Sequence, residues 1–213
     1  MSGPHQNQPV ATAGTAPEDA QAGVVLVHGR GATARGMVGI AEDIGVDGVA
    51  YRAPQAARGS WYPNRFIAPI EQNEPHLASA LQAVSDSVES FVDAGIPYDR
   101  IVVLGFSQGA CLGSEFVART TRRYGGVVAF SGGLIGPLGS EFDHEGDLEG
   151  TPVFLGCSDS DPHIPVERVH ETRDVFERLG GEVEERIYEG MGHTINADEI
   201  GYVRELLSDL TSD

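Results

Sequence analysis

The sequence contains no lysine and only two cysteines among its 213 residues. Without lysine, neither a Schiff-base mechanism nor the lysine-containing loop that binds nucleotide phosphates is available. Cys111 and Cys157 are too few for a disulfide framework, and both lie in apolar runs typical of small core residues. No group of cysteines and histidines has the spacing of zinc ligands, so we expect neither a metal nor another cofactor.

Positive charge is also scarce. The chain has 14 basic residues, all arginine, against 32 acidic ones, which gives a net charge of −18. Because nucleic acids and anionic membranes are polyanions, this balance argues against binding either of them. Such an acidic surface suits a salt-rich cytoplasm, where screening weakens the repulsion between carboxylates. We therefore expect a halophilic host.

Long apolar runs are absent as well. No stretch approaches the ~18 to 20 apolar residues of a membrane span, and the first twenty residues lack the pattern of a secretory signal. We expect a cytoplasmic protein without membrane insertion. Residues 21–213 are expected to form a single domain, and residues 1–20 a weakly ordered lead-in with at most a short edge strand near Val10. A homodimer is an assembly state that the sequence leaves open.

Apolar runs suited to strands alternate along the chain with stretches of helical periodicity. The predicted strands cover residues 23–27, 46–52, 101–104, 126–130, 152–157 and 182–188. The predicted helices cover residues 33–43, 75–94, 107–119 and 166–179, with a last one near the C-terminus. This alternation predicts an α/β protein with a mostly parallel central sheet and helices on both faces. Functional groups then gather beyond the carboxyl ends of the strands.

One of these strand ends carries a motif for nucleophilic catalysis. The apolar run 101–104 leads into Gly105-Phe106-Ser107-Gln108-Gly109, and a helix follows at once. A Gly-x-Ser-x-Gly turn between a strand and a helix is typical of a nucleophile elbow, which exposes the serine hydroxyl above the sheet. We therefore expect Ser107 to act as a nucleophile.

A serine nucleophile needs a base, and the base needs an orienting carboxylate. Asp161 and His193 each follow a predicted strand, and the order Ser107, Asp161, His193 is that of α/β-hydrolases. Asp159 lies in the same loop and is the alternative carboxylate; Asp161 is favoured because Pro162 stiffens its backbone. The other six histidines lie in predicted helices, in polar segments expected to be mobile, or in loops where another role fits better.

Two backbone N–H groups must also face the developing oxyanion. Gln108, directly after the nucleophile, is expected to supply one, and Arg30 in the loop after strand 23–27 the other. His28, two residues before Arg30 in the same loop, is expected to be a structural hydrogen-bonding residue. We further hypothesise that the charge of Arg30 favours substrates with an anionic end.

Together these residues resemble the phospholipase/carboxylesterase group of α/β-hydrolases, which includes acyl-protein thioesterases and bacterial carboxylesterases. The resemblance implies a Ser–His–Asp hydrolase that cleaves carboxylic esters or thioesters through an acyl-enzyme, without a cofactor. Arg30 departs from the leucine usual in thioesterase members, and the variant is similar to a prokaryotic subgroup linked with aromatic or quinone-related compounds. The matching segments are 27–31, 53–55, 60–62, 105–109, 161–165 and 191–193.

The long segment 53–74 is expected to shape the pocket, because long loops in compact domains are often functional. Trp61, Tyr62, Phe66 and Ile67 are its candidate substrate-binding residues. The loop 131–151 is too short for a large cap domain, so we expect an open site for small acyl or aromatic substrates. Two alternatives remain: an enzyme like the dienelactone hydrolases of aromatic or quinone metabolism, and a non-catalytic binding protein on the same fold.

Overall fold

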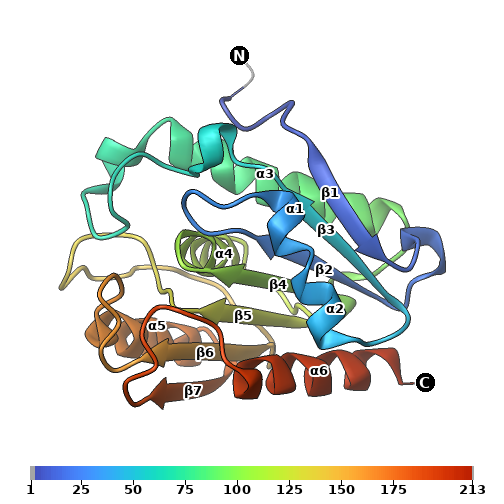
Figure 1. Ribbon diagram of the computed structural model, residues 1–213. Coiled ribbons are helices and arrows are strands. Elements are labelled where there is room, and N and C mark those ends of the chain that lie inside the picture. Colours follow the sequence, from blue (N-terminus) through green and yellow to red (C-terminus); the bar gives the residue numbers. More distant parts are fainter. Residues whose placement is uncertain (1–2, 213) are drawn as a thin grey trace.

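A computed structural model describes residues 3–212 and has one seven-stranded sheet at its centre (Figure 1). The strand order is β1-β3-β2-β4-β5-β6-β7, and every neighbouring pair is parallel except β1 with β3. The expected α/β-hydrolase fold with a mostly parallel sheet is thereby confirmed. The strands are β1 (Val10–Gly14), β2 (Ala22–Val27), β3 (Val49–Pro54), β4 (Ile101–Phe106), β5 (Gly126–Phe130), β6 (Pro152–Ser158) and β7 (Glu182–Tyr188).

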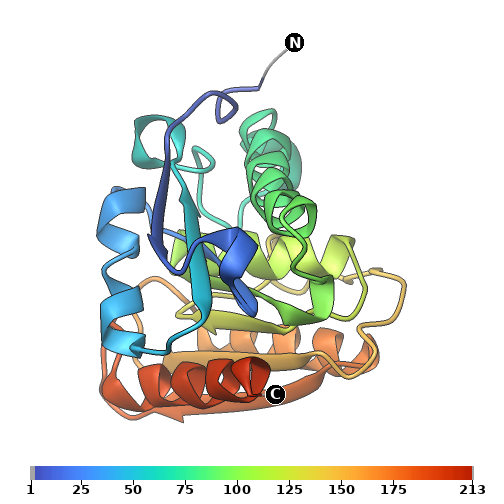
Figure 2. The same cartoon turned by 90° about the vertical axis from the view of Figure 1, so that its right-hand side faces the viewer.

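Helices cover both faces of this sheet (Figures 1 and 2). One layer contains α3 (His76–Asp93), α4 (Gln108–Arg119) and α5 (Val166–Arg178). The opposite layer contains α1 (Ala34–Met37), α2 (Ile40–Ile44) and α6 (Ala197–Thr211). Four short 3-10 helices lie in connections, at Pro17–Asp19, Ala57–Gly59, Ile70–Asn73 and Tyr98–Arg100. No helix or strand lies between β5 and β6, which agrees with the expected absence of a large cap.

The central strands are apolar throughout because both of their sides are covered. All six residues of β2 are buried, and its side chains alternate between the two faces. Val25 and Val27 belong to the core under α3, α4 and α5, whereas Val24 and Leu26 belong to the core under α1, α2 and α6. Edge strand β7 instead alternates exposed and half-buried residues over its first half.

The N-terminal segment is more ordered than expected. The predicted edge strand near Val10 is present as β1, paired antiparallel with β3. His5 is buried: its Nε2 lies 2.8 Å from the carbonyl oxygen of Trp61, and its Nδ1 accepts from the N–H of Ala57 at 3.0 Å. Where the sequence predicted a weakly ordered lead-in over residues 1–20, the structure places β1 and this buried histidine; residues 1–2 lie outside the described residues. Backbone pairing and the polar contacts of His5 and Gln6 hold this segment, and neither depends on apolar content.

One predicted helix is divided in two. The range predicted as residues 33–43 contains α1, begun by the Thr33 side chain that accepts from the N–H of Gly36, and α2, which ends at a left-handed Gly45. At the junction of α1 and α2, the N–H groups of residues 39, 41 and 42 donate to carbonyl oxygens three residues back. Such i→i+3 bonds mark a tightened turn, and the two glycines, Gly36 and Gly39, weaken a continuous helix here.

Candidate active site

Ser107 occupies a strained turn between β4 and α4. Its φ of 55° and ψ of −121° fall where L-residues are rarely found. The turn requires glycine on both sides. A Cβ on Gly105 would lie 2.3 Å from the carbonyl oxygen of Gly109, and a Cβ on Gly109 would lie 2.0 Å from that of Val27. The sequence expectation of an elbow at this position thus has a direct steric reason.

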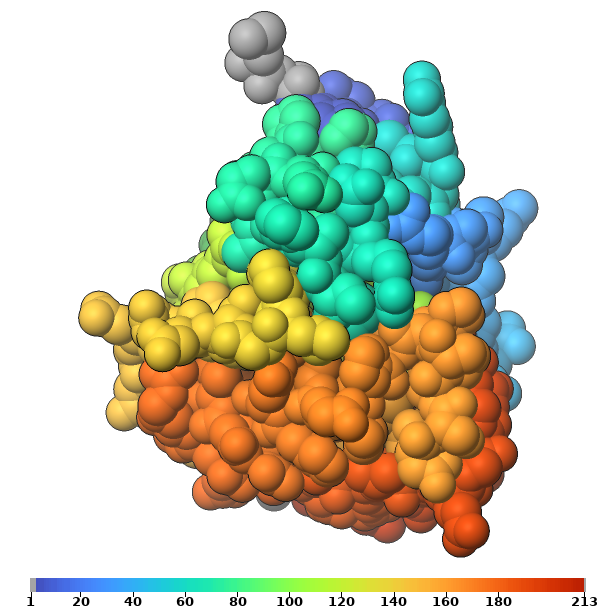
Figure 3. All heavy atoms as spheres, turned by 90° about the vertical axis from the view of Figure 1, so that its left-hand side faces the viewer, coloured from blue at the N-terminus to red at the C-terminus, as the bar shows by residue number. Residues whose placement is uncertain are grey.

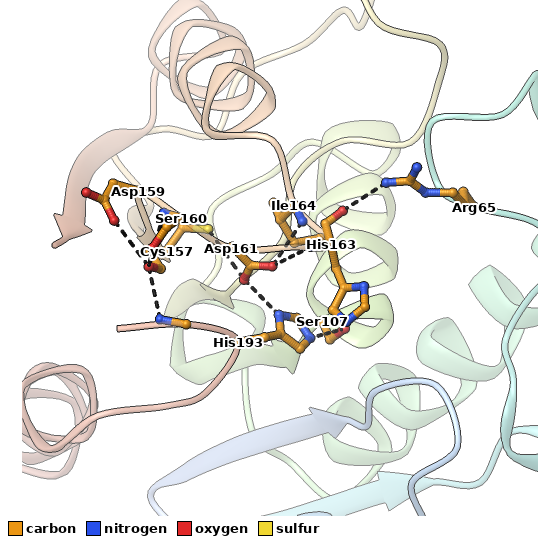
Figure 4. A network of polar contacts seen from close by, with 11 residues as sticks. Arg65, Ser107, Cys157, Asp159, Ser160, Asp161, His163, Ile164 and His193 are labelled. Atoms are coloured by element: carbon orange, nitrogen blue, oxygen red, sulfur yellow. Dashed lines mark hydrogen bonds and ion pairs between the residues drawn. The ribbon is translucent and has the colours of Figure 1, made fainter. Parts of the chain in front are cut away.

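The loops after β6 and β7 bring a carboxylate and an imidazole to this serine (Figure 4). His193 Nε2 lies 2.9 Å from Ser107 Oγ, and His193 Nδ1 lies 2.7 Å from Asp161 Oδ2. With the Nδ1 proton donated to the carboxylate, Nε2 is free to accept the serine proton. The three residues predicted to act together are therefore in hydrogen-bonding contact.

Asp161 is held on both of its oxygens. Oδ2 faces His193, while Oδ1 accepts from the N–H groups of His163 at 2.8 Å and Ile164 at 3.1 Å. Burial acts to raise the pKa of this carboxyl, but the bonds from His193 and the two amides outweigh it and keep that pKa below its usual value. The alternative, Asp159, instead accepts from the N–H of Gly190 at 2.9 Å.

Two aromatic rings fix the plane of the imidazole. The Phe106 ring lies 4.9 Å from the His193 ring with a 35° tilt, and the His163 ring meets it edge-on at 4.8 Å. Sequence reasoning gave neither residue a role in the site. Their positions offered a signal, since Phe106 precedes the serine and His163 follows Asp161 by two residues.

The loop after β2 forms the wall opposite His193. His28 is buried, with Nδ1 2.8 Å from the carbonyl oxygen of Gly29 and Nε2 accepting from the N–H of Ala56 at 3.1 Å. Burial lowers the pKa of this imidazole, so it remains neutral and structural, as expected. Arg30 follows it and lines the same cavity as Ser107 and Gln108.

A cavity of about 670 Å³ lies over these residues. Its apolar wall includes Tyr62, Phe66, Phe106 and Ile164, and its polar edge includes Arg30 and Arg65. Figure 3 shows this face of the molecule, where the segment around residues 60–75 meets the loop that follows β6. An apolar pocket with a few convergent polar groups is the usual form of a small-molecule site.

Comparison with known proteins places the chain in a family. Residues 10–211 match the phospholipase/carboxylesterase family model. The chain belongs to this family. A phospholipase/carboxylesterase from Dyadobacter fermentans is 40% identical, with a TM-score of 0.91 over 98% of this chain and 100% of that one. Acyl-protein thioesterase 1 from Yarrowia lipolytica is 25% identical, over 87% of this chain and 90% of its own length. Acyl-protein thioesterase 1 from Neurospora crassa is 29% identical over 65% of this chain, which spans 57% of that relative.

The loop residues assigned to substrate binding divide into two pairs. Tyr62 and Phe66 line the cavity, whereas Trp61 and Ile67 are not among its lining residues, and substrate binding by this loop stays a prediction. The Trp61 side chain is fully buried, and its Nε1 donates to the carbonyl oxygen of His28 at 2.8 Å. Ile67 packs against the same core from a half-buried position. Trp61 and Ile67 therefore pack the core, whereas Tyr62 and Phe66 of the same loop also reach the cavity.

The Gln108 side chain has a structural task in addition to the expected role of its backbone. Its Oε1 accepts from the N–H of Trp61 at 3.0 Å, and its Nε2 donates to the carbonyl oxygen of Tyr62 at 2.9 Å. The first residue of α4 therefore ties the pocket loop to the elbow.

Within residues 3–212 no group of three or more His, Cys, Asp or Glu is placed to hold a metal ion. In the same range, no helix combines the length and apolar character needed to cross a bilayer.

Proposed function

We propose that this protein is a serine hydrolase that cleaves carboxylic esters or thioesters of small acyl or aromatic substrates. One observation carries the proposal: the unbroken hydrogen-bond chain from Asp161 through His193 to Ser107, at 2.7 and 2.9 Å, on the floor of an apolar cavity. A binding protein would have no need for a strained serine aligned with a base. Membership of a family of ester-cleaving hydrolases supports the same reading.

In the proposed reaction, His193 Nε2 removes the hydroxyl proton as Ser107 Oγ attacks the substrate carbonyl. The backbone N–H groups of Arg30 and Gln108 stabilise the oxyanion, and Asp161 stabilises the imidazolium. His193 then donates its proton to the leaving oxygen or sulfur, which leaves an acyl-enzyme. Water, activated by the same imidazole, attacks the acyl carbonyl and releases the acid together with the free serine.

The surroundings of the site support small substrates. The cavity of about 670 Å³ is open, because no cap domain interrupts the chain between β5 and β6. The two kinds of named relative, a phospholipase/carboxylesterase and acyl-protein thioesterases, support ester and thioester bonds as the candidate targets. The charge of −18 supports a cytoplasmic protein of a salt-rich host, and the homodimer stays a prediction.

A panel of nitrophenyl esters and acyl thioesters tests the proposed reaction. We expect turnover by the wild type and a loss of about a thousandfold or more in Ser107→Ala. Ser131→Ala is the matched control, because Ser131 follows β5 as Ser107 follows β4 and also has a positive φ, of 50°. The Ser131 hydroxyl makes no hydrogen bond to the imidazole within the described residues, so the Ser131→Ala variant should keep its activity. Equal activity of the wild type and Ser107→Ala would refute the proposal.

A further inference from the structure

The wall of the cavity has the opposite charge to the rest of the chain. Arg30 and Arg65 both line it, and no Asp or Glu is among its lining residues within the described part of the chain. Acidic residues outnumber basic ones by 32 to 14 over the whole sequence, so a purely positive wall runs against the composition. A local field of one sign inside a cleft selects ligands of the opposite sign.

Arg30 is fixed in place but keeps its charge. Its guanidinium donates to the carbonyl oxygens of residues 62, 63 and 64, at 2.8, 3.1 and 2.7 Å. These contacts hold the loop that carries Tyr62, but a carbonyl is a dipole and cannot cancel a full charge. Across residues 3–212, neither Arg30 nor Arg65 takes part in an ion pair.

Arg65 directly follows the three residues that Arg30 contacts and reaches the catalytic loop. Figure 4 shows it reaching toward His163, to whose carbonyl oxygen its guanidinium donates at 3.3 Å. This long contact is its one hydrogen bond from the guanidinium within the described residues. The side chain is exposed, and a guanidinium has five N–H donors in a planar fork, so donors remain for a ligand.

The Asp161 carboxylate, which contacts the catalytic imidazole, does not offset these two charges. The Asp161 side chain is 0% exposed, and both of its oxygens accept hydrogen bonds, from His193 and from the two amides of its own loop. Its negative charge is therefore directed at the imidazole and away from the cavity. An incoming anion meets the two guanidinium groups first.

From this arrangement we propose that the preferred substrate is an ester or thioester that also carries a free carboxylate, bound by Arg65 beside the fixed charge of Arg30. The inference rests on the proposed hydrolase function and narrows its substrate class. A planar guanidinium matches the two oxygens of a carboxylate, which gives orientation as well as attraction. A phosphate dianion fits less well, because the charge of −18 repels it more strongly during approach.

The test compares mono-4-nitrophenyl suberate with its methyl ester, which has the same chain but no charge. We expect the wild type to have the higher kcat/KM on the acid. Arg65→Gln should lower the acid-to-ester ratio about fivefold, mainly through KM, as for a charge pair at a partly solvated site. Arg65→Glu should lower it further. Arg35→Gln is the matched control, because Arg35 is exposed and lies outside the cavity lining, so the ratio should not change.

The two proposals fail in different ways in this experiment. If the wild type cleaves neither compound and none of the esters and thioesters of the panel above, the hydrolase function is refuted. If it cleaves both compounds equally well and Arg65→Gln leaves their ratio unchanged, the carboxylate preference is refuted and the hydrolase function stands. Added salt should raise KM for the acid alone, because screening weakens attraction between exposed charges.

Discussion

Replacing Asp161 with asparagine should disable the site by reversing one hydrogen bond. Oδ1 of Asp161 accepts from two backbone N–H groups, of His163 and Ile164. An asparagine must place its amide oxygen there, because its NH2 group would face two donors in the opposite orientation. The NH2 group then points at His193 Nδ1 and forces the imidazole proton onto Nε2. An Nε2 that carries a proton cannot accept the one from Ser107.

The size of the effect follows from how often the asparagine adopts the opposite rotamer, in which its amide oxygen faces His193 and its NH2 group faces the two backbone N–H groups. That rotamer would restore the productive imidazole but lose both backbone bonds, at about 1–3 kcal/mol each. A total of about 2–6 kcal/mol corresponds to a loss of between about thirtyfold and about 10⁴-fold in kcat. The fold should be retained, because the side chain keeps its shape.

Steady-state hydrolysis of a nitrophenyl ester measures this loss, and a thermal melt confirms folding. Asp159→Asn is the matched control, with the same change two residues away. Asp159 accepts from the N–H of Gly190 rather than from His193, so we expect its kcat to stay within about twofold of the wild type. A loss of less than about tenfold in Asp161→Asn, or equal losses in the two variants, would refute the reasoning.

Two further predictions concern stability. Burial raises the pKa of Glu199 to about 7, from 4.5. Because the folded state then binds a proton that the unfolded state has released, stability should fall by up to about 3 kcal/mol as pH rises from about 5 to about 8. In urea titrations at the two pH values, Glu199→Gln should remove most of this fall, and an unchanged fall would contradict the assignment. Arg168, fully buried, donates to three carbonyl oxygens in residues 134–137, so Arg168→Met should cost about 3–5 kcal/mol. Arg173→Met on the same helix is its partly exposed control and should cost under about 1 kcal/mol; equal costs would contradict the role of Arg168.

The sequence predicted the parts of the fold that depend on local pattern. A buried parallel strand requires a continuous apolar run, as in β5, and an edge strand alternates, as in the first half of β7. Both strands were predicted with the bounds that the structure shows. The elbow was predictable because a tight strand-to-helix turn tolerates only glycine two residues before and two residues after Ser107. Strand order then brought Asp161 and His193 together, since the carboxyl ends of parallel strands share one edge.

Features that depend on contacts between distant segments were not predictable. Trp61 was assigned to the ligand, but the carbonyl oxygen of His28, 33 residues away, holds its ring in the core. The Arg30 side chain binds backbone carbonyl oxygens, which carry no sequence signal. Strand β1 was underestimated because an edge strand with alternating exposure needs few apolar residues.

The central claim is that Ser107 is an activated nucleophile, and covalent labelling tests it most directly. After incubation with a fluorophosphonate, intact-mass and peptide analysis should show one adduct per chain, located on Ser107. Urea-unfolded protein should not react, because the activation depends on the folded contact of 2.9 Å with His193. An absence of adduct on the folded protein, or an adduct on another residue, would contradict the account.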